Sequence, residues 1–290
     1  MQVYHNSSFS MGTRFNLLLP GIEKPGGAML YASVMYELNR IENMLSCFMP
    51  DSEISRINEN AYSRPVEIND ELFYVLTECL RYSELTEGAF DISLGKIIDH
   101  WSEKDVKTDI KVLTEGCGAD KILLDPSDKT VRFTSPHVKI NLGGYGKGYA
   151  LENVQRLLKE KAISSAFISF GESSLSCLGK HPHGEYWPVG IRDHYQKDKS
   201  IAALKLLNSS VSTSGNMENN NHLINPTKGS PVDEKMHVSV KSRSAIIAEV
   251  LSTALCVADK SSWKNIQIVF PGIEILRVVY RAGKADVLSF

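Results

Sequence analysis

The chain has 290 residues, enough to bury a substantial core, and its 42% hydrophobic and 23% charged residues give an ordinary globular balance. Its formal net charge is −2, so it lacks the basic surplus that a nucleic-acid-binding surface requires. No apolar run approaches the roughly 20 residues of a transmembrane segment, and the longest candidate, Ile266–Val279, is interrupted by proline, glycine and charged residues.

The first half of the chain predicts a strand followed by two helices. Phe15–Pro20 has strand character, and a turn-rich segment follows it. Apolar residues then recur every three to four positions, as on one face of an amphipathic helix: Leu30, Val34, Leu38, Ile41 and Leu45. A second helix is expected to begin after Asn69 as its N-cap and to end at Gly88.

Extended segments and two further helices are expected in the second half. The extended segments are Ile122–Leu124, Val131–Phe133, Val138–Leu142, Ala166–Phe170, Leu175–Leu178 and Tyr186–Ile191. One helix follows Gly143–Gly148, another carries Ile246 to Leu255, and Ile266–Tyr280 resembles a hairpin. The absence of a βαβ rhythm favours an α+β fold with mixed, largely antiparallel sheets packed with helices. We expect one domain over residues 1–290, with two closely packed subdomains as the alternative.

Five cysteines are scattered at irregular spacings, without any C-x-x-C pair: Cys47, Cys79, Cys117, Cys177 and Cys256. This pattern favours reduced core thiols over a disulfide framework or a zinc site. Residues 1–11 have neither the basic region nor the apolar core of a signal peptide. We therefore expect a cytoplasmic location for this chain, and an exported or periplasmic one if a leader precedes it.

The densest motif is the glycine-rich segment Asn141–Tyr149, between an expected strand and an expected helix. Glycines let a backbone approach a ligand closely, a helix N-terminus favours anions, and Lys147 adds a positive charge. The segment matches neither a Walker A loop nor G-x-G-x-x-G. A phosphate site and a plain tight turn are equally good interpretations of this segment alone.

Glu249 and Thr253 lie one helical turn apart, so their side chains share one face of the expected helix. A carboxylate and a hydroxyl so placed suit a hard cation such as magnesium, which also takes phosphate oxygens. Taken alone, this spacing is more typical of a solvated helix edge.

Two polar segments offer further candidates. Ser212–Asn216 and His222–Gly229 combine hydroxyls and amides with glycine and proline, and His222 has the chemistry of a general base near neutral pH. An ordinary polar loop is the simpler reading. In Gly88–Asp91, Asp91 is expected to cap a turn, with packing of Phe90 on a planar ring as the functional alternative.

Taken together and in order, these segments resemble the ApbE family of FAD:protein FMN transferases. The resemblance covers nearly the whole chain and rests on Met11–Thr13, Ser46–Phe48, Asp51–Asn58, Gly88–Asp91, Trp101, Leu142–Gly148, Trp187–Asp193, Thr213–Gly215, His222–Gly229 and Glu249–Thr253. It implies an ApbE-like, T-fold-related architecture. It also implies magnesium-dependent transfer of the FMN part of FAD to a threonine or serine hydroxyl of an acceptor flavoprotein, with release of AMP.

The resemblance assigns a role to each matching residue. Magnesium would be held by the main-chain carbonyl of Gly144 with Glu249 and Thr253, and His222 would lie near the reacting phosphate. From its chemistry, His222 is our candidate to take the proton of the attacking hydroxyl. The remaining positions would contact FAD: Met11, Phe48, Ala89, Phe90, Asp91, Asn141, Lys147 and Thr213.

Several residues depart from the family pattern. Glu249 replaces an aspartate, which moves the carboxylate outward by one methylene, and Asn141 replaces an acid before the glycines. Asn225 likewise replaces an aspartate, Cys47 a threonine, and Phe170–Glu172 a G-G-D sequence. These changes leave two alternatives open: an FAD pyrophosphatase, in which water replaces the acceptor hydroxyl, and a non-catalytic FAD-binding protein.

Overall fold

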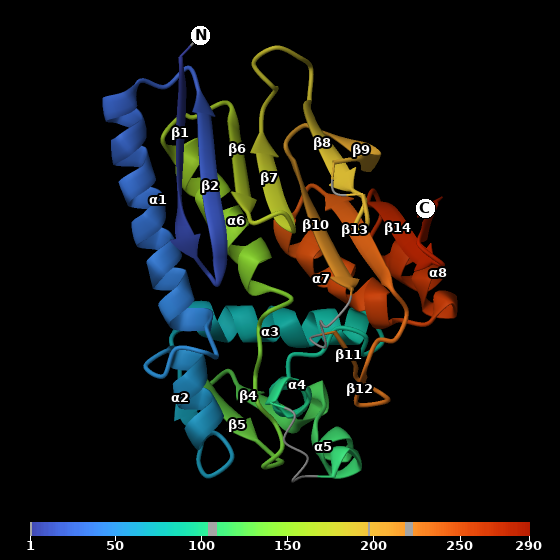
Figure 1. Cartoon of the computed structure of the whole chain (residues 1–290). Helices are drawn as coiled ribbons and strands as arrows, with labels where there is room; N and C mark the ends of the chain where they lie inside the picture. Colours follow the sequence, from blue (N-terminus) through green and yellow to red (C-terminus); the bar gives the residue numbers. More distant parts are fainter. Residues whose placement is uncertain (1, 104–108, 197, 218–222) are drawn as a thin grey trace.

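A large antiparallel sheet forms the centre of the protein (Figure 1). The computed structural model describes residues 2–103, 109–196, 198–217 and 223–290. Within these ranges the sheet has eight strands, in the spatial order β1 (Val3–Ser10), β2 (Thr13–Pro20), β6 (Ala166–Phe170), β7 (Ser174–Leu178), β10 (Ser209–Asn216), β13 (Met236–Ser242), β14 (Glu274–Arg281) and β15 (Lys284–Ser289). The first and last strands of the chain are therefore its two edges.

Helices cover one face of this sheet. α6 (Gly146–Glu160) and α7 (Ala245–Val257) pack against each other and against the sheet, α1 (Lys24–Leu45) packs on α6 and β1, and α8 (Lys260–Val269) follows α7 (Figure 1). The apolar face expected for α1 is confirmed, because Val34, Leu38 and Ile41 are fully buried. No helix among the described residues is long and apolar enough to cross a membrane.

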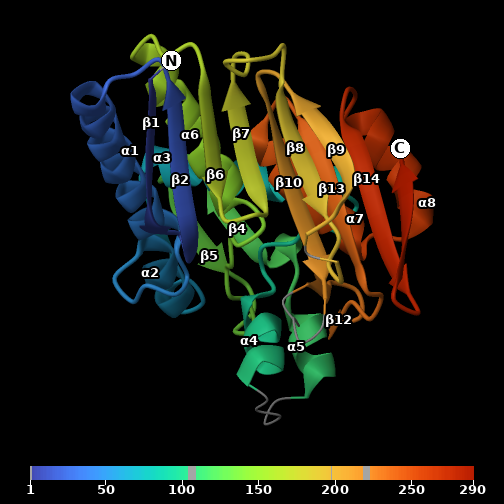
Figure 2. The ribbon, with the colours of Figure 1, turned by 45° about the horizontal axis from the view of Figure 1, so that its top comes forward.

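The opposite face carries a separate hairpin of β8 (Trp187–Arg192) and β9 (Ser200–Leu206), seen in front of β10 and β13 in Figure 2. Trp187 and Val189 cluster with apolar side chains of β7 and β10, and Ile191 clusters with those of β14. Successive side chains of a strand point to opposite faces, and Leu175 of β7 and Val211 of β10 point toward the hairpin and pack against it. The intervening serines of β7 and β10 face the helices instead.

His237 lies on β13, on the hairpin side of the sheet, with 8% of its surface exposed. Burial, aided by the nearby His194, lowers the pKa of the imidazole to about 4. An unfolded chain binds a proton at this residue below about pH 6.5, whereas the folded chain does not do so until about pH 4. Its contribution to stability is therefore largest above pH 6.5 and is lost progressively as the pH falls to about 4.

Urea unfolding at pH 7 and pH 5 checks the predicted effect of His237 on stability. Between these two values the wild type is expected to lose about 2 kcal/mol of unfolding free energy more than His237→Gln, which cannot titrate. Equal losses in the two proteins would show that His237 titrates normally in the fold.

A smaller layer lies beyond α3 (Asp70–Leu85), which crosses below the sheet in Figure 1. Besides α3, it contains α2 (Glu53–Asn60), α4 (Gly95–Glu103), α5 (Ile110–Gly116), the 3₁₀ turn η1 (Ala119–Lys121), a sheet of β3 (Val66–Glu67), β5 (Thr130–Phe133) and β4 (Ile122–Asp125), and the pair β11 (Ile224–Asn225) and β12 (Ser230–Pro231). The N-cap expected for α3 is confirmed, since the Asn69 Oδ1 accepts from the Leu72 N–H at 2.8 Å. The mixed, largely antiparallel α+β architecture is likewise as expected.

Two sequence expectations were wrong. The hairpin is β14–β15, not Ile266–Tyr280, because α8 extends to Val269. Trp263, Ile266 and Phe270 follow helical spacing and are buried, whereas the sequence reading took the apolar residues after Ile266 as a strand. Within the described ranges, Val138–Leu142 joins no sheet and makes one isolated bridge, Leu94 with Lys139. The side-chain amide of Asn58 takes the place of a neighbouring strand by pairing with the N–H and C=O of Ile140.

Candidate functional site

The segments that carry the sequence motifs meet around a cavity of about 500 Å³. The start of α6, the middle of α7, the end of β10 and the segment after α3 each contribute to it. Its lining includes ten of the residues proposed from the sequence: Phe48, Ala89, Phe90, Asp91, Asn141, Gly144, Lys147, Thr213, Glu249 and Thr253. The size is that of a small-molecule or cofactor site.

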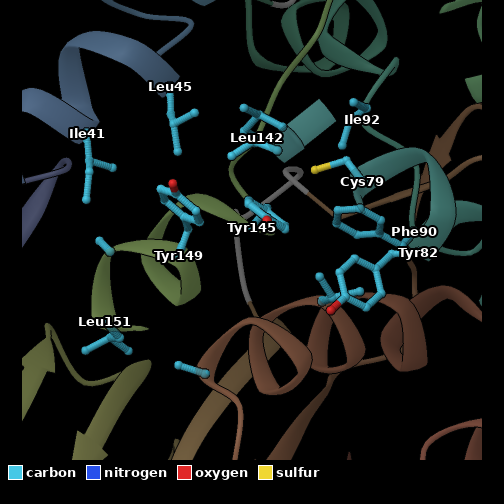
Figure 3. Close-up of a cluster of buried hydrophobic side chains, with 14 of the residues drawn as sticks. Ile41, Leu45, Cys79, Tyr82, Phe90, Ile92, Leu142, Tyr145, Tyr149 and Leu151 are labelled. Carbon is cyan, nitrogen blue, oxygen red and sulfur yellow. The ribbon is translucent and has the colours of Figure 1, made fainter. Parts of the chain in front are cut away.

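The glycine-rich segment is anchored in the core on both sides of its glycines. Leu142 and Tyr145 are buried, and Figure 3 shows both within the cluster that also contains Cys79, Tyr82 and Phe90. Gly143 and Gly144, between them, line the cavity. The Asn141 Oδ1 accepts from the Gly143 N–H at 2.8 Å, so this amide supports the turn even though it replaces the acid of the family pattern.

Two glycines allow α6 and its preceding turn to lie close to α7. A Cβ on Gly144 would lie 3.1 Å from the Thr253 Oγ1, and one on Gly148 would lie 2.7 Å from the Ala245 main-chain oxygen and 2.9 Å from the Glu249 Cβ. The close packing brings Gly144, Lys147, Glu249 and Thr253 together at the N-terminus of α6.

Replacing Gly148 by alanine is expected to lower the unfolding free energy by about 1–3 kcal/mol, because the new methyl group meets rigid main-chain atoms of α7. This cost exceeds the gain in helix propensity. Urea unfolding measures it. Gly146→Ala is the matched control, since its Cβ would meet only the flexible end of Met11, at 3.3 Å. Equal losses in both variants would contradict the packing argument.

Glu249 is buried, with 3% of its surface exposed, so the solvated helix edge suggested by spacing alone is excluded. Its Oε1 forms an ion pair with Lys147 Nζ. Its Oε2 accepts hydrogen bonds from Ser174 Oγ at 2.7 Å and from Ser212 Oγ at 2.8 Å. A buried charge requires such partners. One oxygen is thus held by the sheet, while the other faces the lysine.

Hydroxyl groups extend this network to Thr253. Ser252 donates to Ser212 at 3.2 Å, Ser214 lies 2.9 Å from Ser252, and Thr253 Oγ1 lies 3.2 Å from Ser214 Oγ. These contacts orient the carboxylate and the hydroxyl that share one face of α7. On the other face of β10, Thr213 Oγ1 lies 2.8 Å from Ser239 Oγ.

The oxygen groups at the N-terminus of α6 match the preferences of magnesium. Among the described residues, no cluster of three or more His, Cys, Asp or Glu side chains could hold a metal ion. One carboxylate, one hydroxyl and a nearby main-chain segment are an incomplete set, of the kind that magnesium completes with water and substrate phosphates. Glu249, Thr253 and Gly144 therefore fit a site that forms together with a phosphate ligand.

Met11 lies in an adjoining cavity of about 340 Å³, which shares Phe48, Asn141, Gly143 and Lys147 with the first. Met11 has a left-handed backbone (φ 50°), and its N–H donates to Glu42 Oε2 at 3.0 Å. Phe48 is 80% exposed, which is unusual for a large apolar ring. The two cavities thus offer an apolar chamber beside a polar one.

Phe90 and Asp91 differ in what they present to the cavity. Phe90 is buried in the core cluster, so most of its ring packs against protein (Figure 3). Asp91 caps the next turn, as expected, by accepting from the Ser93 N–H at 2.7 Å, and burial raises the pKa of its carboxyl. His222 lies outside the described residues, but Leu223 and Ile224, which follow it, line the cavity.

The sequence did not reveal Ser174 and Ser212 as partners of Glu249. Buried serines give no periodic signal, and the strand was expected to begin at Leu175, one residue after Ser174. Only the pairing of β7 with β10, which places Ser174 opposite Ser212, brings the two hydroxyls to one carboxylate oxygen.

Comparisons with known proteins identify the family of this chain. The sequence model of the ApbE family matches residues 11–275. The FAD:protein FMN transferase of Escherichia coli K12 is 24% identical over 277 residues, covering 89% of this chain and 79% of the relative. That of Klebsiella pneumoniae is 26% identical over 268 residues, with coverages of 86% and 76%.

Solved structures show the same fold. The flavin transferase ApbE from Vibrio cholerae superposes with a TM-score of 0.86 at 22% identity, covering 99% of this chain and 97% of the other. The ApbE protein from Thermotoga maritima gives a TM-score of 0.86 at 23% identity, with coverages of 99% and 96%. Because the family match spans most of its length, the chain belongs to the ApbE family.

Proposed function

We propose that this protein is a magnesium-dependent FAD:protein FMN transferase, which moves the FMN part of FAD to a threonine or serine hydroxyl of an acceptor flavoprotein. The observation that supports this most directly is the grouping of Lys147, Glu249 and Thr253 at the glycine-rich N-terminus of α6, beside an apolar chamber. A pyrophosphate linking a flavin to a nucleoside needs that combination of charge and apolar surface.

The chemistry is a displacement at phosphorus. The acceptor oxygen forms a bond to the FMN phosphorus, the bond from that phosphorus to the AMP oxygen breaks, and AMP leaves. Bound magnesium would neutralise phosphate charge as a Lewis acid, held by Glu249, Thr253 and the main chain of Gly144. His222 is the candidate to take the hydroxyl proton, a role proposed from its sequence context alone.

The residues of this chain supply positioning and electrostatics. Lys147 and the first N–H groups of α6 present positive charge where the pyrophosphate would lie. Met11 and Phe48 offer apolar contact for the flavin ring in the adjoining cavity. Ser174 and Ser212 hold one oxygen of Glu249, so the other remains directed to the cavity side.

Incubation with FAD, magnesium and flavin-free flavoproteins of the source organism tests the proposal. Covalent flavin is read by in-gel fluorescence and intact mass, and AMP by chromatography. We expect a fluorescent acceptor band with one AMP released per flavin transferred, and loss of both with EDTA. AMP and FMN release without an adduct would instead show a pyrophosphatase. FAD binding without turnover would show a non-catalytic binder.

A further inference from the structure

A third cavity, of about 650 Å³, lies between the β8–β9 hairpin and the large sheet. Its walls come from three places: the turn between β6 and β7, the end of β8, and the hairpin-facing side of β10 and β13. The residues that matter below are Glu172, Ser173, Val189, Arg192, Asp193 and Thr213. Of the residues given a role so far, Thr213 lines this cavity as well as the site cavity.

The third cavity meets the site cavity directly. Ser173, Thr213 and Gly215 line both. The site cavity in turn shares four residues with the apolar chamber around Met11. The three cavities therefore lie in sequence, with Lys147, Glu249 and Thr253 in the middle one. A second substrate can therefore reach the reacting phosphorus from the third cavity without passing through the apolar chamber around Met11.

Its charge argues against a nucleotide. Among the described residues, the charged side chains lining it are the carboxylates of Glu172 and Asp193 and the guanidinium of Arg192, which gives a formal charge of −1. Arg192 is already paired with Glu172 at 2.9 Å. Asp193 is buried, and its Oδ1 accepts from the N–H groups of Tyr195 and Gln196 at 2.9 and 3.2 Å. An adenylate group would thus meet net negative charge, whereas a basic chain would be attracted and a neutral chain would not be repelled.

The wall also offers a strand edge. β8 supplies Val189, Gly190, Ile191 and Arg192 to the cavity and, among the described residues, pairs only with β9. Its second edge therefore has main-chain N–H and C=O groups without a neighbouring strand. An extended polypeptide can pair with such an edge, while apolar residues such as Val189 receive its side chains.

We propose that the acceptor segment flanking the modified hydroxyl binds in this third cavity, under the β8–β9 hairpin, and that a neutral or basic segment is preferred. The inference rests on the proposed transferase function, and it adds where the acceptor binds and which flanks it prefers. The flavin and the acceptor then approach the site from opposite sides, and the acceptor hydroxyl reaches the phosphorus past Ser173 and Thr213.

Charge reversal at Glu172 tests this. Synthetic peptides with one central threonine, flanked by lysines in one set and by glutamates in the other, are incubated with FAD and magnesium, and covalent flavin is measured. Wild type is expected to label the lysine set faster. Glu172→Lys should lower that preference about five- to tenfold. Glu185→Lys is the matched control. Glu185 lies just before the start of β8, whereas Arg192, the partner of Glu172, lies at its end. Like Glu172, Glu185 is exposed and forms an ion pair with one cation.

Affinity for FAD and for AMP, measured by flavin fluorescence and calorimetry, separates the remaining outcomes. Unchanged FAD and AMP affinity in Glu172→Lys, with altered flank preference, supports the proposal. Tighter FAD or AMP binding with unaltered preference would overturn it and assign the cavity to the adenosine half of FAD. No change in either readout would also overturn it. If wild type labels neither the peptides nor any flavoprotein, the proposed transferase function itself fails.

Discussion

Glu249→Ala is expected to reduce flavin transfer by at least about a hundredfold, because it removes the carboxylate that lies with Thr253 and Gly144 beside the proposed phosphate site. The loss should appear as a much weaker response to added magnesium. FAD affinity measured without magnesium should change little, since Glu249 does not line the cavity around Met11, where we propose that the flavin binds. Rates of covalent flavin formation across a magnesium titration give the result.

Two further variants separate charge from shape at this position. Glu249→Gln keeps the length of the side chain but removes the charge, so it should be nearly as inactive as Glu249→Ala. Glu249→Asp keeps the charge but shortens the reach toward Ser174 and Ser212, and it should retain intermediate activity. If Glu249→Ala still transfers flavin at the wild-type rate with the same magnesium dependence, Glu249 is not a metal ligand.

Lys147→Met is expected to lower the unfolding free energy by about 2–3 kcal/mol in metal-free buffer, because the buried carboxylate of Glu249 loses its ion-pair partner. Because Lys147 is partly exposed, we expect a smaller loss of unfolding free energy than for a fully buried ion pair. Flavin transfer should also fall about a hundredfold as the pyrophosphate loses a cation. Urea unfolding and transfer rates measure the two effects.

A double variant shows whether the stability loss comes from the unpaired charge. In a Glu249→Gln background, Lys147→Met should cost much less, because no buried carboxylate is left unpaired. Millimolar magnesium should restore part of the stability of Lys147→Met but not that of the double variant. This readout is independent of activity. An equal cost in both backgrounds would mean that Lys147 stabilises the fold through packing rather than through Glu249.

The strongly periodic elements could be predicted from the sequence, and so could most of the residues that line the site cavity. α1, α3, α6 and α7 were expected because their apolar residues follow helical spacing. β1 was not expected, because its polar residues at Asn6–Ser8 interrupt the apolar pattern. α2, with its N-cap Ser52, was recognised only as part of a motif. α8 was misread because an apolar run of that length suits a strand as well as a short helix.

The site itself needed the fold. Glu249 and Thr253 are close in sequence, so their shared face was predictable, but burial of Glu249 follows from how α7 packs on β10 and α6. The partners of Glu249 come from elements whose alignment no local pattern encodes. The third cavity was equally hidden, because it exists only where a separate hairpin lies over the large sheet.

The partners of Glu249 also bear on how the protein folds. Its ion pair with Lys147 spans 102 residues of chain, and its hydrogen bonds with Ser174 and Ser212 span 75 and 37. Closing such long loops has a large entropic cost before the contacts can repay it, so these contacts are expected to form late in folding. During refolding, helical signal should therefore return before the ability to transfer flavin, and a chain cut short before α7 should contain no functional site.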